Sequence, residues 1–435
     1  MSDRLDADVA IVGAGPAGIA AAVAAAESGR RVALLDAAPG PGGQIWRHRS
    51  VDELSRTARR WLGRLDASGA RMLPGASVFS LSPKHLDAEF EGAHLRIDAK
   101  ALILATGAME RWLPFPGWTL PGVVGVGGIQ ALIKSGADLT GKRVIVAGTG
   151  PLLLPVAATL ARSGARLAMV AEQAPFNRVA AFAAGLWRWP GRLLQAAAYR
   201  RAFFRARYLT GTWVTHAAAG DHGLRVTLSN DRREWSVACD FLCTGAGLVP
   251  STELARLLGC ELDGRVVRVD RYQQTSVPRV FAAGEPTGNS GADAALVEGT
   301  IAGLTAAGAA VRAERHFPAR DRHRAFARAV GTAFAPRPEL FRLADAETIV
   351  CRCEDIPLGA LRAGWSAREA KLATRIGMGP CQGRVCGPIL EALFGAAPDT
   401  VRIPVWPTAV GALAGAGSDS IPESVPSGIP AEPWL

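Results

Sequence analysis

The chain contains little lysine and cysteine and lacks a long uninterrupted apolar segment. Only five of its 49 basic residues are lysine, so its net charge of +10 comes almost wholly from arginine and says little about binding partners. The longest uncharged run, residues 144–161, contains glycines and prolines that suit a strand, a turn and a helix better than a membrane span. The first residues lack the basic and apolar regions of a signal peptide. We therefore expect no transmembrane segment and a cytoplasmic location.

One arginine-rich stretch also contains aromatic residues. Residues 176–209 mix arginine with Trp, Phe and Tyr, as membrane-surface helices and grooves for single-stranded nucleic acid can. The simpler interpretation is helices with an apolar face on the core and arginine on the solvent face. We favour that interpretation and expect no nucleic-acid partner. The main alternative is docking of a partner protein.

Residues 9–36 have the pattern of a buried strand, a glycine-rich turn, a helix and a second strand. In such a unit Gly13 permits the tight turn, Gly15 lets the backbone approach a pyrophosphate, and Gly18 lets the helix pack closely on the strand. The helix N-terminus supplies N–H donors for the phosphates. Asp36 stands about 20 residues further on, where a carboxylate can accept hydrogen bonds from a ribose. The pattern predicts a dinucleotide site.

Two further strands end in loops typical of flavoproteins: ATG at residues 105–107, and AAGE at residues 282–285 before an alanine-rich helix. Together with GAGPAG and the loop 40–46, they resemble the FAD domain of the two-dinucleotide-domain flavoproteins, the glutathione reductase and thioredoxin reductase superfamily. The resemblance implies that Glu285 contacts the ribityl chain, where the superfamily usually has Asp, and that the helix from Ala292 points its N-terminus at the flavin. The residues assigned to FAD are Gly13, Ala14, Gly15, Pro16, Ala17, Gly18, Asp36, Ala37, Gly43, Gln44, Thr106, Gly107, Gly284, Glu285 and Ala292.

The strand, loop, helix and strand pattern repeats at residues 141–173. A second Rossmann-like domain, nested between the two halves of the FAD domain, accounts for the repeat. Its loop, GTGPLL, has Leu153 at the third glycine position, where a side chain would hold the helix off the strand. Glu172 could still accept a hydrogen bond from a ribose hydroxyl. We expect a retained scaffold rather than a working NAD(P)H site.

The CxxC disulfide that the superfamily places over its flavin is missing from this sequence. Cys239 and Cys243 are four strand residues apart, roughly 13 Å, which exceeds the ~7 Å limit between bridged Cα atoms. We expect both of them, and Cys260, to be packing thiols. A thioredoxin reductase or dithiol relay is therefore excluded.

The remaining four cysteines form a CxC and a CxxxxC motif: Cys351, Cys353, Cys381 and Cys386. Four thiolates suit an iron–sulfur cluster or zinc, and structural zinc more often uses CxxC knuckles. The glycines around the second pair leave backbone N–H groups free to approach cluster sulfurs. The segment resembles the 2Fe-2S domain of bacterioferritin-associated ferredoxin. We assign the four cysteines to a 2Fe-2S cluster, with zinc and four unrelated thiols as alternatives.

The expected fold class is α/β: two nested Rossmann-like dinucleotide-binding domains of the glutathione-reductase type and a small C-terminal helical 2Fe-2S domain. The expected divisions are residues 1–120 and 240–330 for FAD, 121–239 for the degenerate NAD(P)-binding-like domain, 345–400 for the cluster, and 401–435 for an extended Pro/Gly-rich tail.

Nearly the whole chain resembles the α (A) subunits of heteromeric FAD-dependent amine and imino-acid dehydrogenases, a group that includes opine oxidases, D-hydroxyproline and L-proline dehydrogenases and hydrogen cyanide synthase. The resemblance implies a partner β subunit of the D-amino-acid-oxidase type that oxidises the substrate. It implies that this chain transfers the electrons onward, and the resemblance does not identify their acceptor. It also allows a small additional subunit and an FMN at the subunit interface.

The residues agree with that division of labour. No set of side chains suits substrate oxidation, and the seven histidines are scattered and expected at the surface, so we assign no catalytic residue. The alternatives are a self-contained NAD(P)H-dependent FAD/2Fe-2S reductase, a hydrogen cyanide synthase subunit that acts on glycine, and a non-catalytic interaction protein with structural zinc.

Overall fold

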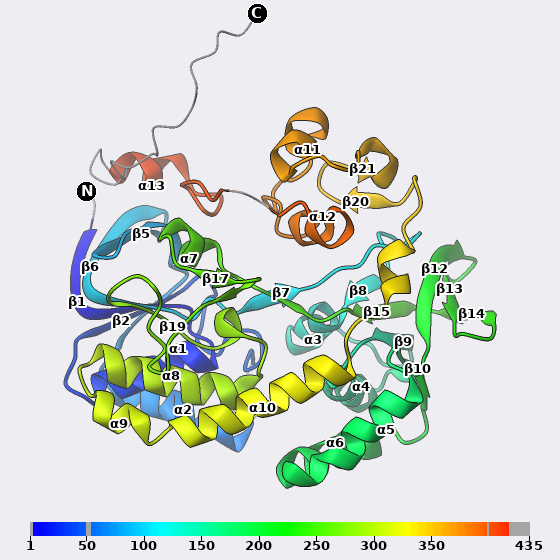
Figure 1. Ribbon diagram of the computed structural model, residues 1–435, viewed down its shortest axis with the longest axis horizontal. Coiled ribbons are helices and arrows are strands. Elements are labelled where there is room, and N and C mark those ends of the chain that lie inside the picture. The colour runs from blue at the N-terminus through cyan, green and yellow to red at the C-terminus, as the bar shows by residue number, and fades with distance from the viewer. Residues whose placement is uncertain (1–2, 49–53, 398–399, 417–435) are drawn as a thin grey trace, which may run out of the picture.

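The computed structural model describes residues 3–48, 54–397 and 400–416, which are built on two parallel sheets and a smaller C-terminal module (Figure 1). In the first sheet the strands follow the order β3, β2, β1, β6, β5, β4, and β19 pairs with the last residues of β6. Pairings among β3, β2, β1, β6 and β19 are all parallel. The strands are β1 (Asp3–Val12), β2 (Val32–Asp36), β3 (Arg71–Pro74), β4 (Ser77–Leu81), β5 (His85–Phe90), β6 (Ala93–Leu104) and β19 (Val280–Ala282).

Both faces of this sheet are covered. Strand β1 contributes Val9 and Ile11 to one apolar cluster and Ala10 to the other, because alternate side chains point to opposite faces. Helices α1 (Pro16–Ala26) and α8 (Ala292–Ala306) lie together on the first face. A methyl group added at Gly299 of α8 would lie 2.0 Å from the backbone oxygen of Ala17. The two helices therefore touch backbone to backbone, with both N-termini near the carboxyl ends of the strands.

The second sheet lies to the right of the first in Figure 1 and has the parallel order β11, β10, β9, β15, β8. An antiparallel sheet, β12–β13–β14, flanks it, and the short pair β7–β16 runs between the two large sheets. These two sheets confirm the expected Rossmann-type α/β fold. The strands are β7 (Ala108–Glu110), β8 (Val123–Gly125), β9 (Arg143–Gly148), β10 (Arg166–Glu172), β11 (Arg207–Thr210), β12 (Trp213–Gly220), β13 (Gly223–Ser229), β14 (Glu234–Cys239), β15 (Phe241–Gly245) and β16 (Leu248–Pro250).

The helices of the two sheets differ in how far they are buried. Helix α4 buries five side chains against the second sheet, whereas α5 and α6 have no residue classed as buried. No helix in the described ranges is both long and apolar enough to cross a bilayer. The helices outside the C-terminal module, besides α1 and α8, are α2 (Arg56–Ala67), α3 (Val126–Lys134), α4 (Leu153–Arg162), α5 (Phe176–Gly185), α6 (Pro190–Ala202), α7 (Glu253–Leu257), α9 (Ala310–Glu314) and α10 (Phe317–Ala333).

The stretch 176–209 differs from its expected arrangement. Its inner side packs as expected, with Phe182 and Trp189 against Phe326 of α10. Its outer side, expected to present arginine alone, also exposes Trp187 and Leu194, at 70% and 71%. The error arose because the helices are short and lie at the edge of the domain, where one core face cannot cover apolar side chains on both sides.

The C-terminal module packs on the second domain and then returns to the first. The indole N–H of Trp118 donates to the carbonyl oxygen of Ile349 at 2.6 Å, and Val350 and Cys351 join the same apolar cluster as Trp118. Residues 401–416 belong to the tail that was expected to be extended, but they end in a helix that lies on β6. Residues 417–435 of that tail fall outside the described part. The elements are β17 (Leu262–Asp263) and β18 (Val266–Val267) of the first domain, and β20 (Ile349–Cys351), β21 (Ile356–Pro357), α11 (Ala367–Thr374), α12 (Cys386–Phe394) and α13 (Val410–Gly415).

One histidine departs from the expected surface location. His94 is only 5% exposed and its Nε2 lies 2.9 Å from Oδ1 of the fully buried Asp87, beneath Gly415 of α13. It stands at the start of β6, about 33 Å of strand away from Leu104 at the other end. His94 therefore belongs to the packing of the C-terminal segment and not to a site at the carboxyl ends of the strands.

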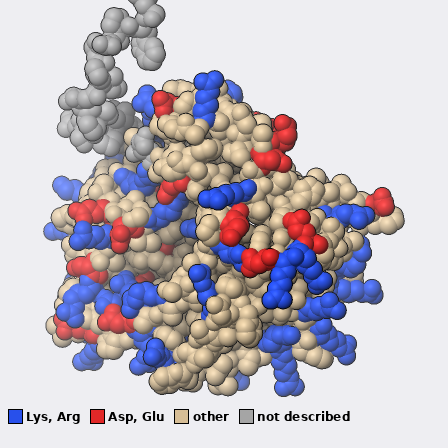
Figure 2. All heavy atoms as spheres, turned by 45° about the vertical axis from the view of Figure 1, so that its right-hand side comes forward, with Lys and Arg blue, Asp and Glu red and all other residues tan. Residues whose placement is uncertain are grey.

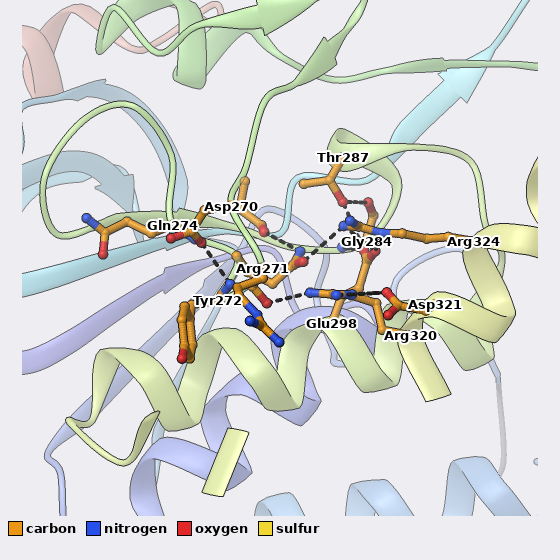
Figure 3. Close-up of polar contacts among 12 residues, drawn as sticks. Asp270, Arg271, Tyr272, Gln274, Gly284, Thr287, Glu298, Arg320, Asp321 and Arg324 are labelled. Carbon is orange, nitrogen blue, oxygen red and sulfur yellow. Dashed lines mark hydrogen bonds and ion pairs between the residues drawn. The ribbon is translucent and has the colours of Figure 1, made fainter. Parts of the chain in front are cut away.

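A buried ion pair joins α8 to α10 beneath the loop that follows β19 (Figure 3). Glu298 is 1% exposed, and its Oε1 pairs with Arg324 at 2.9 Å. Its Oε2 accepts hydrogen bonds from the backbone N–H of Gly284 at 3.0 Å and from the hydroxyl of Thr287 at 2.9 Å. One carboxylate thus holds two helices and one loop in a fixed relation.

Replacing Glu298 with Gln should lower the free energy of unfolding by about 3 kcal/mol, because Arg324 loses its buried counter-charge. Urea titration measures the change. The matched control is Glu261→Gln, which removes an ion pair whose side chains are 72% and 60% exposed and should cost at most about 1 kcal/mol. Equal effects of the two substitutions would contradict this assignment.

Candidate functional site

The GAGPAG loop lies where β1 ends and α1 begins, and two of its glycines are there because nothing larger fits. Gly13 has φ +102°, and a methyl group on it would lie 2.2 Å from the backbone oxygen of Ala105. A methyl group on Gly18 would lie 1.7 Å from the oxygen of Gly13. By contrast, a methyl group added to Gly15 would have no other atom within 4 Å. The loop is therefore tight on its protein side and open on the side where a pyrophosphate would approach.

The neighbouring residues assigned to FAD close around the same loop. The Asp36 carboxylate accepts hydrogen bonds from the backbone N–H groups of Ala14, at 2.6 Å, and Ala38, at 2.7 Å, and so fixes the loop and the residue after Ala37. The loop that contains Gly43 and Gln44 approaches Gly15: a methyl group on Gly43 would lie 3.0 Å from the Cα of Gly15. Helix α1 begins at Pro16 and continues through Ala17.

Thr106 and Gly107 follow the carboxyl end of β6, beside this loop. The Thr106 hydroxyl donates to the carbonyl oxygen of Ser251 at 2.6 Å, and the N–H of Ser251 donates to the oxygen of Gly107 at 3.0 Å. These bonds tie the end of the first sheet to the segment that returns from the second domain. The two residues therefore form one wall of the site together with the chain crossing at Ser251.

Glu285 shows the clearest sign of a missing polar partner. Its Oε1 accepts from the backbone N–H of Gly291 at 3.2 Å, while its buried Oε2 has no hydrogen-bond partner among the described residues. Burial raises the pKa of this carboxyl to about 7. Gly284 precedes it, and Ala292 begins α8 with no side chain capping the helix N-terminus. An acceptor without a donor beside a free helix N-terminus fits a ligand that carries hydroxyl groups and negative charge.

Glu298 and Arg324 are site-supporting residues that the sequence patterns missed. They stand 13 and 39 residues after Glu285 and belong to no motif. The one signal was an acidic residue in the middle of an alanine-rich helix, where its neighbours in the sequence are apolar or small and a buried position is unusual for Glu. Their contacts hold the loop from Gly284 to Thr287 in place, as Figure 3 shows.

The second glycine loop has a different geometry at the position of Leu153. Counted from the first glycine of each loop, α1 begins three residues later, at Pro16, whereas α4 begins five residues later, at Leu153 itself. The Leu153 side chain is fully buried. Its N–H donates to the oxygen of Gly150 at 3.2 Å, and the N–H of Leu154 donates to that of Pro151 at 3.2 Å. The N–H groups of Leu153 and Leu154, which could otherwise face a phosphate, therefore donate to carbonyl oxygens of the loop itself.

Residues 334–337, which follow α10, cover this second loop. The Thr149 hydroxyl donates to the oxygen of Phe334 at 2.7 Å, and the Gln173 amide donates to that of Ala335 at 3.2 Å. The N–H of Arg337 donates to the Gln173 side-chain oxygen at 3.0 Å. The polar groups of the loop are thus bonded to the chain itself.

Glu172, considered above as a ribose acceptor, is fully buried. Its oxygens accept from the N–H groups of Gly150 at 2.7 Å and Ala174 at 2.9 Å, and burial raises its pKa to about 7. Asp36 makes the corresponding two bonds in the first loop but is only half-buried. Glu172 is fully enclosed, and for that reason it does not face an open ribose site.

The four cysteines of the C-terminal module come from neighbouring segments: Cys351 ends β20, Cys353 follows two residues later, Cys381 lies in the loop before α12, and Cys386 begins α12. Cys353 contacts Cys381 and Cys386 contacts Cys351, while Cys353 also interacts with Cys351 and Cys386 with Cys381, so all four thiols lie close together. In the described ranges no three His, Cys, Asp or Glu side chains are arranged around one metal position. Two thiol pairs suit a two-iron cluster, which takes two thiolates on each iron, better than one tetrahedral ion.

The backbone around Cys381 also suits bound sulfur. Burial raises the pKa of this thiol, but N–H groups of Val385, Gly383 and Arg384 and the side chain of Cys353 outweigh it, so its pKa is lowered. A methyl group on Gly379 would lie 2.3 Å from the Cβ of Cys353. The glycine-rich loop can therefore wrap the thiols closely, as iron–sulfur ligation requires.

The other three cysteines lie outside this module. Cys239, Cys243 and Cys260 are buried and unbridged, and burial raises the pKa of each thiol. Cys239 ends β14 and Cys243 lies in β15, so they do not share the single strand from which their separation was predicted. Both are nevertheless free, buried thiols, as expected.

A glycine loop at the carboxyl end of each parallel sheet defines a dinucleotide-binding α/β protein of the two-Rossmann type. More particularly, the chain belongs to the pyridine nucleotide-disulphide oxidoreductase family, whose model matches residues 7–310. FAD is the dinucleotide that this family implies for the first loop, and the residues there fit it.

Relatives extend the likeness over nearly the whole chain. The opine oxidase A subunit of Rhizobium meliloti (strain 1021) is 34% identical over 458 residues, covering 94% of this chain and 98% of that protein. The hydrogen cyanide synthase subunit HcnB of Pseudomonas aeruginosa is 33% identical, covering 86% and 90%. The structure of L-proline dehydrogenase from P. horikoshii superposes with a TM-score of 0.68 at 20% identity, covering 95% of this chain and 80% of that one. These matches confirm the resemblance to the opine oxidase and hydrogen cyanide synthase group.

Gly13→Ala should yield a folded chain that does not retain FAD, because the added methyl group would displace the loop from the end of β6. Flavin absorbance per chain after purification measures retention. Gly63→Ala in α2, where nothing lies within 4 Å of the added group, is the control and should keep full flavin content. Full retention by Gly13→Ala would show that the cradle is elsewhere.

The Glu285 carboxyl predicts a pH dependence for the flavin-free protein. Its pKa is raised from 4.5 to about 7 in the folded chain, so between these values the folded state keeps a proton that the unfolded chain releases. The free energy of unfolding contributed by this group therefore falls as pH rises from 4.5 to 7. Glu285→Gln cannot titrate, so its stability relative to the unmodified chain should increase over this interval and level off above it. Denaturant titrations at several pH values measure the difference, and a pH-independent difference would refute the assignment.

Proposed function

We propose that the chain is the electron-transfer subunit of a heteromeric dehydrogenase, and that a separate partner subunit oxidises an amino or imino acid of the hydroxyproline, proline or opine class. The observation that carries this proposal is the closure of the second nucleotide loop by residues 334–337, in a chain that gathers four thiols near its C-terminus. A flavoprotein without a dithiol and without an open pyridine-nucleotide site needs another electron partner. The paired thiols are the group suited to that role.

The proposed cofactors are FAD in the first loop and a 2Fe-2S cluster on Cys351, Cys353, Cys381 and Cys386; when bound, they supply two-electron and one-electron exchange. The chain's own part is to hold them. The GAGPAG loop and α1 face the pyrophosphate, Glu285 accepts from a hydroxyl, and backbone N–H groups surround the sulfur of Cys381. NAD(P) is not proposed as a cofactor.

A cavity of about 990 Å³ beside the cysteine loop supports the further proposal of an FMN at the subunit interface. It lies between the first domain, α11, α12 and the segment 400–408, and Gly377, Gly383 and Cys386 line it on the cluster side. Arg384 is also on its wall, where its buried Nε has no hydrogen-bond partner among the described residues, and arginine suits a phosphate group. The partner proposed for the open side is a β subunit of the D-amino-acid-oxidase type, optionally joined by a small additional subunit.

Two other functions rest on specific observations. A self-contained NAD(P)H-dependent reductase is supported by the family match, and is opposed by Leu153 and the covered second loop. A hydrogen cyanide synthase subunit that works with a partner on glycine is supported by the 33% identity to HcnB. Glycine therefore belongs among the substrates tested with the complex.

Cys381→Ser should remove the cluster and leave the flavin. The expected result for the unmodified chain is flavin absorbance with about two irons and equal acid-labile sulfide, and for the variant flavin absorbance alone. Iron, sulfide and zinc analyses measure this. The control is Cys260→Ser, a buried thiol away from the module, which should keep both groups. One zinc and no iron in the unmodified chain would overturn the cluster proposal.

Anaerobic reduction tests the electron donor. NADH alone should leave the flavin oxidised, because the second loop is covered, whereas the complex purified with its partner should be bleached by proline, hydroxyproline, an opine or glycine. Spectra recorded during each addition measure the reduction. Rapid bleaching of the isolated chain by NADH would instead establish the self-contained reductase.

A further inference from the structure

Residues 176–209, here called the arm, comprise α5, a short 3-10 turn, α6 and the chain leading into β11. Figure 1 shows α5 and α6 at the lower edge of the molecule, on the side away from the C-terminal module. Neither helix has a residue classed as buried. The inner side of the arm is nevertheless anchored by Phe182, Leu186 and Phe203, of which the last two are buried. The arm is therefore a fixed part of the fold with one side turned to solvent.

The outer side concentrates exposed apolar side chains. Eleven large apolar side chains of the described residues are exposed, and five of them lie in the arm, which is 34 residues long. They project from both helices and from the turns next to them, so they are not the edge of a single core face. The five are Phe176 (73%), Trp187 (70%), Leu193 (44%), Leu194 (71%) and Phe204 (65%).

The same outer side carries one sign of charge. The arm contains seven arginines and no aspartate, glutamate or lysine. Among the described residues only Arg192 of these seven pairs with a carboxylate, that of Asp293 at 2.9 Å. Figure 2, in which the right-hand side of Figure 1 is turned forward, shows basic side chains with no acidic ones among them at its lower right. The exposed arginines are Arg178, Arg188, Arg201, Arg205 and Arg207.

Cation and ring lie next to one another on this side. The guanidinium of Arg188 lies 5.4 Å from the ring of Trp187, and that of Arg205 lies 5.5 Å from the ring of Phe204. A side chain of this kind can place its apolar part among acyl chains and its charge among headgroups. Aromatic residues and arginine are also enriched at protein–protein interfaces. The membrane is favoured here by the single sign of charge, since seven arginines and no acidic residue suit an anionic surface. The mixture of Trp, Leu, Phe and unpaired arginine fits the boundary layer of an anionic bilayer.

We infer that the outer side of the arm binds the surface of an anionic phospholipid membrane. Binding would hold the chain at the bilayer, with the C-terminal module on the far side of the molecule. The inference does not depend on the proposed function, because lipid binding needs no electron transfer and no partner subunit.

Sedimentation with vesicles tests this inference on the full-length chain. The chain should sediment with equimolar phosphatidylcholine and phosphatidylglycerol, remain in solution with phosphatidylcholine alone, and be released as salt is raised. Arg201→Gln with Arg205→Gln should weaken binding about fivefold for each charge removed. Trp187→Ser with Leu194→Ser should abolish sedimentation. Unchanged flavin content and circular dichroism show that these surface variants fold.

Matched variants elsewhere on the surface distinguish vesicle binding through the arm from nonspecific binding by exposed apolar or basic side chains. Val311→Ser with Leu372→Ser removes two apolar side chains that are 75% and 70% exposed, and Arg71→Gln with Arg166→Gln removes two exposed charges. All four substitutions should leave vesicle binding unchanged. Equal losses in these controls, or a chain that stays in solution with anionic vesicles at low salt, would overturn the inference. So would failure of the Trp187 and Leu194 variant to bind its partner subunit, since the arm would then be a subunit interface.

Discussion

The close packing of α1 against β6 and α8 is the constraint on which the cofactor site depends. Gly13 lies against the backbone of Ala105, Gly18 against Gly13, and Gly299 against Ala17, each with no room for a methyl group. Because these contacts are between backbones, they cannot adjust by changing rotamers. They bring the N-termini of both helices to the carboxyl ends of the strands, where two positive dipole ends can act on one anionic ligand.

The two glycine loops of the chain show how one side chain alters this arrangement. At the position of Gly18 the second loop has Leu153, and there the helix begins two residues later and the turn is closed by its own hydrogen bonds. The space that the loop would offer to a nucleotide is taken by Phe334 and its neighbours. The second domain therefore keeps the shape of a nucleotide-binding domain while its polar groups are satisfied internally.

Support for the first site comes from far along the chain. Glu298 carries a negative charge into an apolar layer, and it is tolerated there because Arg324, Gly284 and Thr287 all bond to it. The same network leaves the neighbouring Glu285 with one free oxygen. The loop from Gly284 to Thr287 is held in place by Glu298, while the Glu285 oxygen that lacks a partner remains available to a polar ligand.

Local sequence patterns determined the two Rossmann-type sheets and the glycine cradle, because each depends on residues close together in one βαβ unit. The pairing of Cys351 with Cys386, the ion pair of Glu298 with Arg324, and the segment over Thr149 were decided by tertiary packing, since their members are 26 to 185 residues apart. The exposure of Trp187 and Leu194 within residues 176–209 and the burial of His94 were likewise unpredictable from periodicity. Periodicity indicates which face of an element is apolar, but which neighbour covers that face is settled only when the whole chain has folded.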